Sequence, residues 1–163
     1  MTHRRPASRE RHEMTMMRNT IGAALVLATL TAAAPPPQQV VAARHAGFKK
    51  MGAAMKALGD QLKSDAPAKP AMVAAAQAIV TTARQQAALF PAGTGPGAGV
   101  KTDALPAIWT NRAAFDAQMK ALIAESGKLV AVTNGGDVTA IRAQMKATGA
   151  TCAACHRQFR AED

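Results

Sequence analysis

Apolar side chains recur at steps of three and four residues along four stretches of the chain, which is the spacing of one face of an α-helix. The pattern predicts helices over residues 38–64, 71–89, 102–134 and 138–161. On the first of these the inward face consists of Val41, Arg44, Phe48, Met51, Met55, Leu58 and Leu62. Because the steps alternate between three and four, the helices are expected to pack lengthwise along seams.

Three breaks separate these helices. The first two are rich in proline and glycine, which interrupt helices, and the longer of them covers residues 91–99. An Asn-Gly-Gly sequence at 134–136 ends the third segment. Thr102 or Asp103 can cap the third helix, and Asp137 can cap the fourth. Four helices of about 20 residues predict an all-α fold, an antiparallel four-helix bundle.

The composition supports helices but places few large side chains on the apolar helix faces that pack against one another, here called the seams. About 40 of the 163 residues are alanine, aromatic residues make up 3% and tyrosine is absent, so little of the chain favours β-structure. The predicted seams contain many alanines and glycines and few large side chains. Since protein interiors are close-packed, such a bundle is expected to need another group in its core.

The first 33 residues have the order of a secretory signal peptide: a basic stretch, an apolar run over 21–30 and then small residues. We predict a signal peptide over 1–33 and an exported domain over 34–163. The start can also be a later methionine, Met14, Met16 or Met17. The alternative is an uncleaved anchor, but the apolar run is shorter than a membrane-spanning helix. The signal implies delivery to the periplasm without stable membrane insertion after processing.

The net charge of the whole chain is +10 at pH 7, and part of it lies in the predicted signal. Residues 1–33 contain five arginines and two glutamates, which leaves 15 basic and 8 acidic residues, a net charge of +7, in residues 34–163. These charges are scattered, without a basic block or interleaved aromatic residues. The pattern indicates a solvated surface and argues against a nucleic-acid partner.

Cys152-Ala153-Ala154-Cys155-His156 has the C-x-x-C-H spacing of covalent haem attachment. On a helix, steps of three and four residues place Cys152, Cys155 and His156 on one side. The two thiols can then add to the haem vinyl groups as thioethers, and the imidazole can serve as an axial ligand of the iron. One covalent haem c is therefore the predicted cofactor.

Other uses of two cysteines and a histidine fit the sequence less well. A thioredoxin-type redox pair belongs in a βαβ context, which the pattern lacks. A zinc site needs four ligands, and His45 is the one further histidine in residues 34–163, which gives three. A disulfide between residues three apart in one helix would be strained.

The motif and its surroundings resemble the cytochromes c′, a family within the class II c-type cytochromes. Residues 149–160 are similar to the C-terminal haem helix of the family, and residues 44–51 to the Arg-x-x-x-apolar signature of its first helix. Residues 89–94 and 107–109 are similar to its loop and to the start of its third helix. The resemblance covers the chain from about residue 35 onward.

The resemblance implies roles around the haem. The residue four after the helix-one arginine faces the iron opposite the histidine; here it is Phe48, and relatives with Leu or Phe there are five-coordinate. Arg44 is a charge on an apolar face and needs a partner, which is expected to be a haem propionate. His45 is expected at the propionate edge. Arg160, one turn after His156, is expected to cover the proximal face.

Two functions remain open at this point. One is a periplasmic haem protein with five-coordinate iron that binds nitric oxide or carbon monoxide and can pass one electron to an unidentified redox partner. The alternative is a dedicated six-coordinate electron carrier, as in relatives with methionine at the Phe48 position. Met51 and Met55 lie on the same helix face and carry thioether sulfur, although methionine commonly fills protein interiors.

Two further expectations concern catalysis and assembly. An enzyme such as a peroxidase is not expected, because it needs an acid–base group near the iron and Phe48 supplies none. Dimers are common in the resembled family, and alanine-rich helix faces would permit close packing of two copies. A homodimer is therefore compatible with the sequence, as is a monomer.

Overall fold

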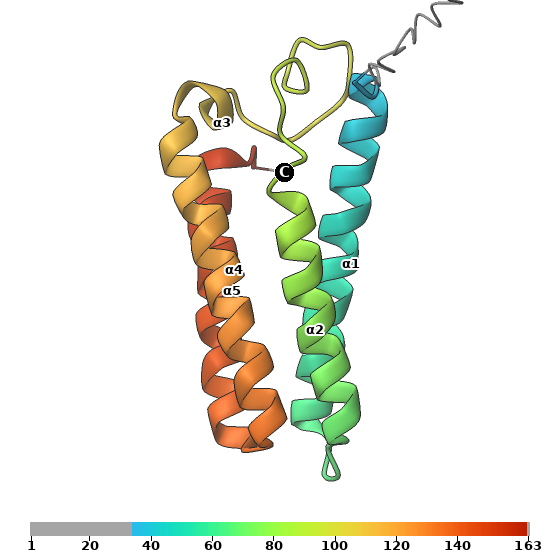
Figure 1. Cartoon of the computed structure of the whole chain (residues 1–163), viewed down its shortest axis with the longest axis vertical. Helices are drawn as coiled ribbons and strands as arrows, with labels where there is room; N and C mark the ends of the chain where they lie inside the picture. The colour runs from blue at the N-terminus through green and yellow to red at the C-terminus, as the bar shows by residue number, and fades with distance from the viewer. Residues whose placement is uncertain (1–33, 163) are drawn as a thin grey trace, which may run out of the picture. The chain divides into compact units, whose positions relative to one another are not determined.

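The computed structural model describes residues 34–162, so the predicted signal over residues 1–33 lies outside the described residues. Within them the only β-like feature is one isolated bridge between Ala104 and Arg160. The predicted all-α class is confirmed for this part of the chain. The helices, labelled in Figure 1, are α1 (Pro37–Lys63), α2 (Lys69–Gln86), α3 (Ala107–Thr110), α4 (Arg112–Gly135) and α5 (Val138–Phe159).

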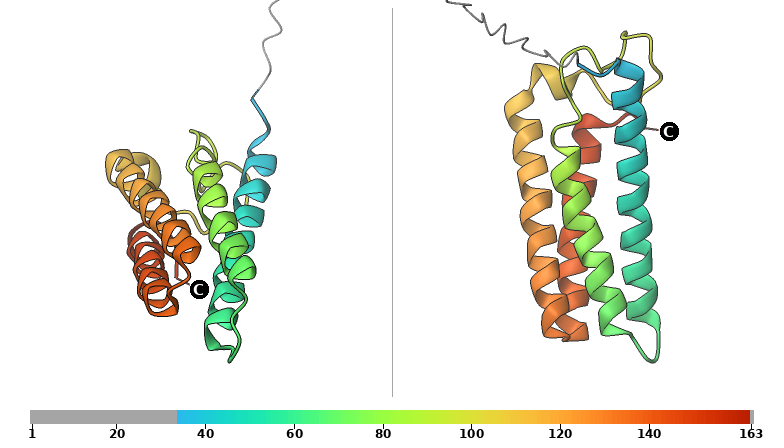
Figure 2. Two further views of the ribbon diagram at one scale, coloured as in Figure 1. Left: turned by 60° about the horizontal axis from the view of Figure 1, so that its bottom comes forward. Right: turned by 45° about the vertical axis from the view of Figure 1, so that its right-hand side comes forward.

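The four long helices run alternately up and down in chain order, as Figures 1 and 2 show. α1 packs along α2, α2 along α4 and α4 along α5, whereas α1 and α5 make little direct contact. This arrangement is the predicted antiparallel four-helix bundle. None of the helices in residues 34–162 is long and apolar enough to cross a membrane.

Proline, aspartate and glycine set several helix ends. Pro37 and Pro70 occupy the first turns of α1 and α2, where the missing N–H of proline costs no helical hydrogen bond. For this reason α2 begins at Lys69, slightly before the predicted start. Asp137 caps α5 as predicted, because its side chain accepts hydrogen bonds from two N–H groups of the first turn. Gly136 ends α4 with a φ of 87°, in the left-handed region that glycine tolerates.

The third helix does not begin at Thr102 or Asp103, as the sequence predicts. The chain stays irregular up to Pro106, because proline disfavours helical backbone in the residue before it and because this segment pairs with the end of α5. α3 then makes a single turn, and Asn111, at φ −125° and ψ 53°, separates it from α4. The Thr102 hydroxyl caps no helix and accepts a hydrogen bond from the Ala104 N–H at 3.2 Å.

A backbone clamp joins the end of α5 to the segment before α3. The Leu105 N–H donates to the Phe159 carbonyl at 3.0 Å, and the Ala161 N–H donates to the Asp103 carbonyl at 2.8 Å. Arg160 is extended between these two bonds. The helix therefore ends at Phe159, before the predicted end at Ala161.

The second helix ends at Gln86, earlier than the predicted Leu89. Pro91 restricts the residue before it to extended backbone, so the helix cannot continue through Phe90. The Phe90 side chain is nevertheless buried, with 4% of its surface exposed.

The predicted seams form the core, and they close more tightly at one end of the bundle than at the other. The end that carries the α1–α2 and α4–α5 connections, here called the closed end, is filled by large buried side chains: Leu58, Leu62, Met72, Leu129 and Ile141. At the opposite end, here called the open end, four seam residues are only half-buried: Phe48, Met55, Cys152 and Cys155. These four residues border a cavity.

Candidate functional site

A cavity of about 620 Å³ occupies the open end of the bundle. Its walls come from α1, the first half of α4, the last turns of α5 and the loop before α3, and most of its lining is apolar. The cavity explains why α1 and α5 make so little contact, since they face each other across it. Its volume lies in the range of sites for cofactors and other small molecules, and it provides the space that the thin seams led us to expect.

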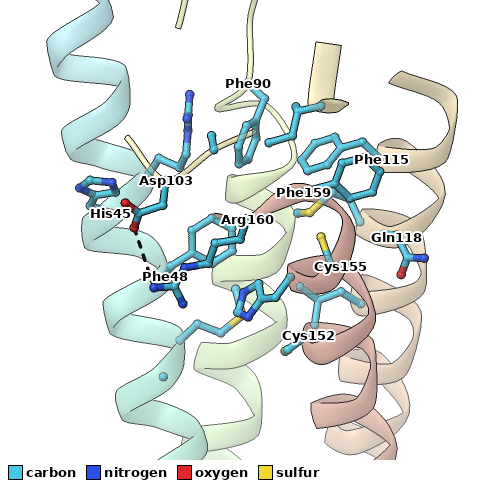
Figure 3. Close-up of a pocket in the computed structure, with 18 of the residues that line it drawn as sticks. His45, Phe48, Phe90, Asp103, Phe115, Gln118, Cys152, Cys155, Phe159 and Arg160 are labelled. Atoms are coloured by element: carbon cyan, nitrogen blue, oxygen red, sulfur yellow. Dashed lines mark ion pairs between the residues drawn. The ribbon is translucent and has the colours of Figure 1, made fainter. Parts of the chain in front are cut away.

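α5 brings both cysteines to this cavity. Figure 3 shows Cys152 and Cys155 one turn apart on the helix, and both line the cavity. They are free cysteines, and the Cys152 Sγ lies 3.7 Å from the Thr148 carbonyl oxygen. Burial raises the pKa of both thiols, that of Cys155 to about 11 with a contribution from neighbouring Cys152. Both side chains are therefore neutral thiols at neutral pH.

His156 lines the cavity beside the two thiols. Burial lowers the pKa of its imidazole, and the positive charge of Arg160 lowers it further. Neutral imidazole is the form that binds a metal ion. α5 thus presents two thiols and a neutral imidazole to one cavity.

The facing wall, α1, is built differently. Phe48, Met51, Gly52 and Met55 line it, and Phe48 has no atom that can bind a metal. Met51 is packed into the core with 4% of its surface exposed, and Met55 is half-buried. Figure 3 shows the Phe48 ring reaching from α1 toward the cavity, across from the two cysteines.

Aromatic rings gather at the loop side of the cavity around Phe90. The Phe90 ring centroid lies 4.6 Å from that of Phe115 and 6.4 Å from those of Phe48 and Trp109. Phe115 in turn makes an edge contact with Phe159 at 5.4 Å. Such tilted and edge-on pairs stabilise a rigid cluster, so the Phe48 ring has a fixed neighbour on this side.

Arg44 is buried among the loop residues, with 3% of its surface exposed. Its Nε donates to the Leu89 carbonyl at 3.0 Å, and one terminal nitrogen donates to the carbonyl and hydroxyl of Thr94 at 3.1 and 2.8 Å. The other terminal nitrogen lies 3.4 Å from the Thr102 hydroxyl, and the guanidinium carbon lies 4.1 Å from the Phe90 ring centroid. Burial lowers the pKa of this guanidinium. The protein itself thus supplies partners for Arg44, and the propionate role stays a prediction.

Polar side chains stand at the exposed side of the cavity. His45 is exposed and lines it together with Asp103 and Arg160. A terminal nitrogen of Arg160 lies 3.8 Å from the Asp103 Oδ2, the ion pair dashed in Figure 3, with 43% and 51% of the two side chains exposed. The predicted placement of His45 and Arg160 beside a haem agrees with their position on the cavity, while their roles stay predictions.

Several cavity residues escaped the sequence reasoning, among them Gln118, Gly52 and Asp103. Gln118 precedes the seam residue Met119 on α4, and the helical period alone could have placed it beside the seam. Gly52 lies one turn after Phe48, which the same period could have shown. Asp103 reaches the cavity through the backbone clamp, a long-range contact that no local pattern signals.

The residues present fit a covalently attached haem better than a bare metal ion. Among residues 34–162 no three His, Cys, Asp or Glu side chains gather as a metal site, so the zinc alternative lacks a ligand set there. Two thiols and an imidazole beside a largely apolar cavity are the donor set of a c-type haem. The fold and the site together define a four-helix-bundle haem protein of the c type.

The comparisons place the chain within a family. A family model described as cytochrome c′ matches residues 39–160, nearly all of the described chain. The chain belongs to the cytochrome c′ family, which confirms the resemblance found in the sequence, and its cofactor is one covalent haem c.

Relatives and solved structures agree with this assignment. The cytochrome c′ of Rhodospirillum rubrum is 38% identical over 109 residues, covering 66% of this chain and 72% of that protein. The structure of a cytochrome c′ with ligand-controlled dimer dissociation matches with a TM-score of 0.74 at 26% identity, covering 80% of this chain and 100% of that one. A nitric oxide complex of a mutant cytochrome c′ from Alcaligenes xylosoxidans matches with a TM-score of 0.72 at 27% identity, with the same coverage.

Proposed function

We propose that this chain is a periplasmic haem protein with five-coordinate iron that binds nitric oxide and carbon monoxide and can also pass one electron. Cys152 and Cys155 form the thioethers, and His156 is the sole protein ligand of the iron. When bound, the haem supplies an iron atom that takes a diatomic ligand and changes oxidation state by one electron. The nitric oxide complex of the related Alcaligenes xylosoxidans protein supports this class of ligand.

The five-coordinate part of the proposal rests on Phe48. It lines the wall of the cavity that faces Cys152, Cys155 and His156, and its ring offers neither a lone pair nor a proton. On that side it would keep water away and would leave the iron without a second protein ligand. The ring is also large and lies against Phe90, with 6.4 Å between the centroids, so it would obstruct a diatomic molecule that approaches the iron.

Arg44 and His45 would receive the haem propionates, and Arg160 would cover the imidazole side. The hydrogen-bond partners of Arg44 are all neutral oxygens of Leu89, Thr94 and Thr102, so its buried charge is not balanced by them. A buried charge of this kind favours an anionic partner. A propionate carboxylate has the required charge.

A six-coordinate electron carrier is the second candidate. Its support is that Met51 and Met55 place thioether sulfur on the same wall as Phe48. The electronic spectrum of the haem-loaded protein separates the two candidates, because five-coordinate iron gives a high-spin spectrum near neutral pH. A low-spin spectrum that is lost in Met51→Leu or Met55→Leu would establish a methionine ligand and overturn the five-coordinate proposal.

Ligand binding tests the proposal directly. The reduced protein should bind carbon monoxide and nitric oxide, and Phe48→Ala should speed carbon monoxide association more than tenfold, which corresponds to removing about 1.4 kcal/mol from the barrier. Met145→Leu, a volume-conserving change outside the cavity, should leave the rate unchanged and serves as the control. A wild type that refuses both gases, or an unchanged rate in Phe48→Ala, would contradict the proposal.

Export and pairing are proposed on separate grounds. The signal-like order of residues 1–33 supports export, and the intact mass of periplasmic protein should then show a chain that begins between Ala34 and Ala43. The related protein with ligand-controlled dimer dissociation supports pairing, as do exposed alanines along α1 at positions 42, 46, 53 and 57. Purified protein that sediments as a monomer at all concentrations would contradict the homodimer.

A further inference from the structure

The wall of the cavity that faces the cysteines contains an unexplained glycine. A glycine inside a helix is destabilising relative to alanine, and α1 contains three of them: Gly47, Gly52 and Gly59. Two are explained by close neighbours. A Cβ at Gly47 would collide with the Gln86 side chain, and one at Gly59 would lie 3.2 Å from a methyl carbon of Met145.

Gly52 has no such neighbour. A Cβ built at this position meets nothing within 4 Å, although the residue lines the cavity. Gly52 is exposed, so the space beside it is open to solvent as well as to the cavity. Phe48 lies one turn earlier on the same face of α1 and lines the same cavity.

The direction of helical side chains makes this space relevant to Phe48. A side chain on a helix leans toward the N-terminus, so the surface that it covers lies over the preceding turn. A side chain at position 52 would therefore cover the surface next to Phe48. Met51, three residues after Phe48, covers one part of the C-terminal flank of the Phe48 ring, and the absence of a side chain at Gly52 leaves the part next to position 52 open.

The other flank of the ring is occupied. Arg44, one turn before Phe48, is held by hydrogen bonds to Leu89 and Thr94 and lies over the Phe90 ring at 4.1 Å. Phe90 is itself buried and packed against Phe115. A Phe48 ring that yields to a ligand cannot move toward this fixed cluster, which leaves the flank beside Gly52.

We propose that Gly52 provides the space into which the Phe48 ring moves when a diatomic molecule reaches the iron, so that Gly52 sets the rate of ligand binding. This inference rests on the proposed function, in which Phe48 obstructs the iron. Gly52 acts through Phe48 and is a positioning residue. A side chain at position 52 would confine the ring and slow the ligand without adding or removing any metal ligand.

Carbon monoxide association after flash photolysis tests this role in the haem-loaded protein. Gly52→Val should slow association by about two- to tenfold, the range expected when a ring is held about 30° from its preferred rotamer, and Gly52→Ala should slow it less. Gly127→Val and Gly127→Ala are the matched controls, since Gly127 is a helical glycine on α4 that also meets nothing within 4 Å and does not line the cavity. They should leave the rate unchanged.

The double variants separate this inference from the proposed function. In a Phe48→Ala background there is no ring to confine, so Gly52→Val should no longer slow association. An effect of equal size in both backgrounds, or no effect of Gly52→Val in the wild type, would overturn the role of Gly52 alone. A wild type that binds neither gas would overturn the proposed function and this inference together.

Ring motion can be observed without ligand binding. The chain contains four phenylalanines, so fluorophenylalanine labelling gives few fluorine resonances, and Phe48→Leu identifies that of Phe48. Gly52→Val should slow the exchange of this resonance and leave the other three unchanged. A Phe48 line shape that does not respond to Gly52→Val would overturn the proposal.

Discussion

At the closed end of the bundle Leu58, Leu129 and Ile141 have no exposed surface, whereas at the open end Phe48 and Cys152, which lie on the same faces of α1 and α5 as Leu58 and Ile141, are half-buried. Large aliphatic side chains fill the first region. The second surrounds a cavity of about 620 Å³. The same helical period therefore builds a self-sufficient core at one end and an incomplete core at the other, and the two ends should depend on different groups for their stability.

The largest difference between the ends should follow from removal of both thiols. In the double variant Cys152→Ala with Cys155→Ala no thioether can form, so acidified acetone should extract the haem that the wild type retains. The open end should then lose ordered packing, because its seams are too small to close alone, while amides near Leu58 keep their protection from hydrogen exchange. The single variant Cys152→Ala, with one thiol left, is the control. Haem retained by the double variant, or amides equally protected from hydrogen exchange at both ends of the bundle, would contradict this difference between the ends.

A smaller effect should come from truncating one large side chain at each end. Leu58→Ala should lower the free energy of unfolding by about 2–5 kcal/mol, as expected for a fully buried leucine, and leave the haem spectrum unchanged. Met119→Ala, which lines the cavity, should alter the spectrum and the carbon monoxide rate. Denaturant unfolding and absorption spectra measure both properties. A haem spectrum that changes equally in the two variants would show that packing at the closed end also determines the surroundings of the haem.

The smallest effect should come from the ion pair at the exposed side of the open end. Asp103→Asn removes the charge that lies 3.8 Å from Arg160, with both side chains about half exposed, and should lower the free energy of unfolding by no more than about 1 kcal/mol. Leu105→Pro removes a donor of the backbone clamp and should cost more. Thermal unfolding of the two variants shows which one loses more stability. A larger loss in Asp103→Asn than in Leu105→Pro would show that the ion pair, and not the backbone hydrogen bond, holds this contact together.

The helices, and the wall of the cavity that carries the two cysteines and the histidine, could be predicted because their signals are local. The spacing of Cys152, Cys155 and His156, and the stripe from Val41 to Leu62, depend only on the helical period. Pro106 is a local signal against a helix start at Thr102 or Asp103, but the pairing of Leu105 with Phe159, far along the chain, has no local signal.

The partners of Arg44 escaped prediction for a related reason. The periodic pattern showed a buried charge in need of a partner, but the Leu89 and Thr94 oxygens that bind it are 45 and 50 positions away. They lie in a loop without periodicity. Loop positions of this kind are set by tertiary contacts, which local propensity does not report.

The backbone clamp also bears on the order in which the chain assembles. It ties residues 103–105 to residues 159–161, so the segment from α3 to α5 forms one closed hairpin, and α1 with α2 forms another. Contacts within each hairpin span fewer positions than the roughly 100 that separate Phe48 from Cys152, which line opposite walls of one cavity, so we expect each hairpin to form before the two dock. On this order the second hairpin would carry both cysteines on a formed helix before the first one covers them, and we expect them to be accessible for haem attachment until the two hairpins dock.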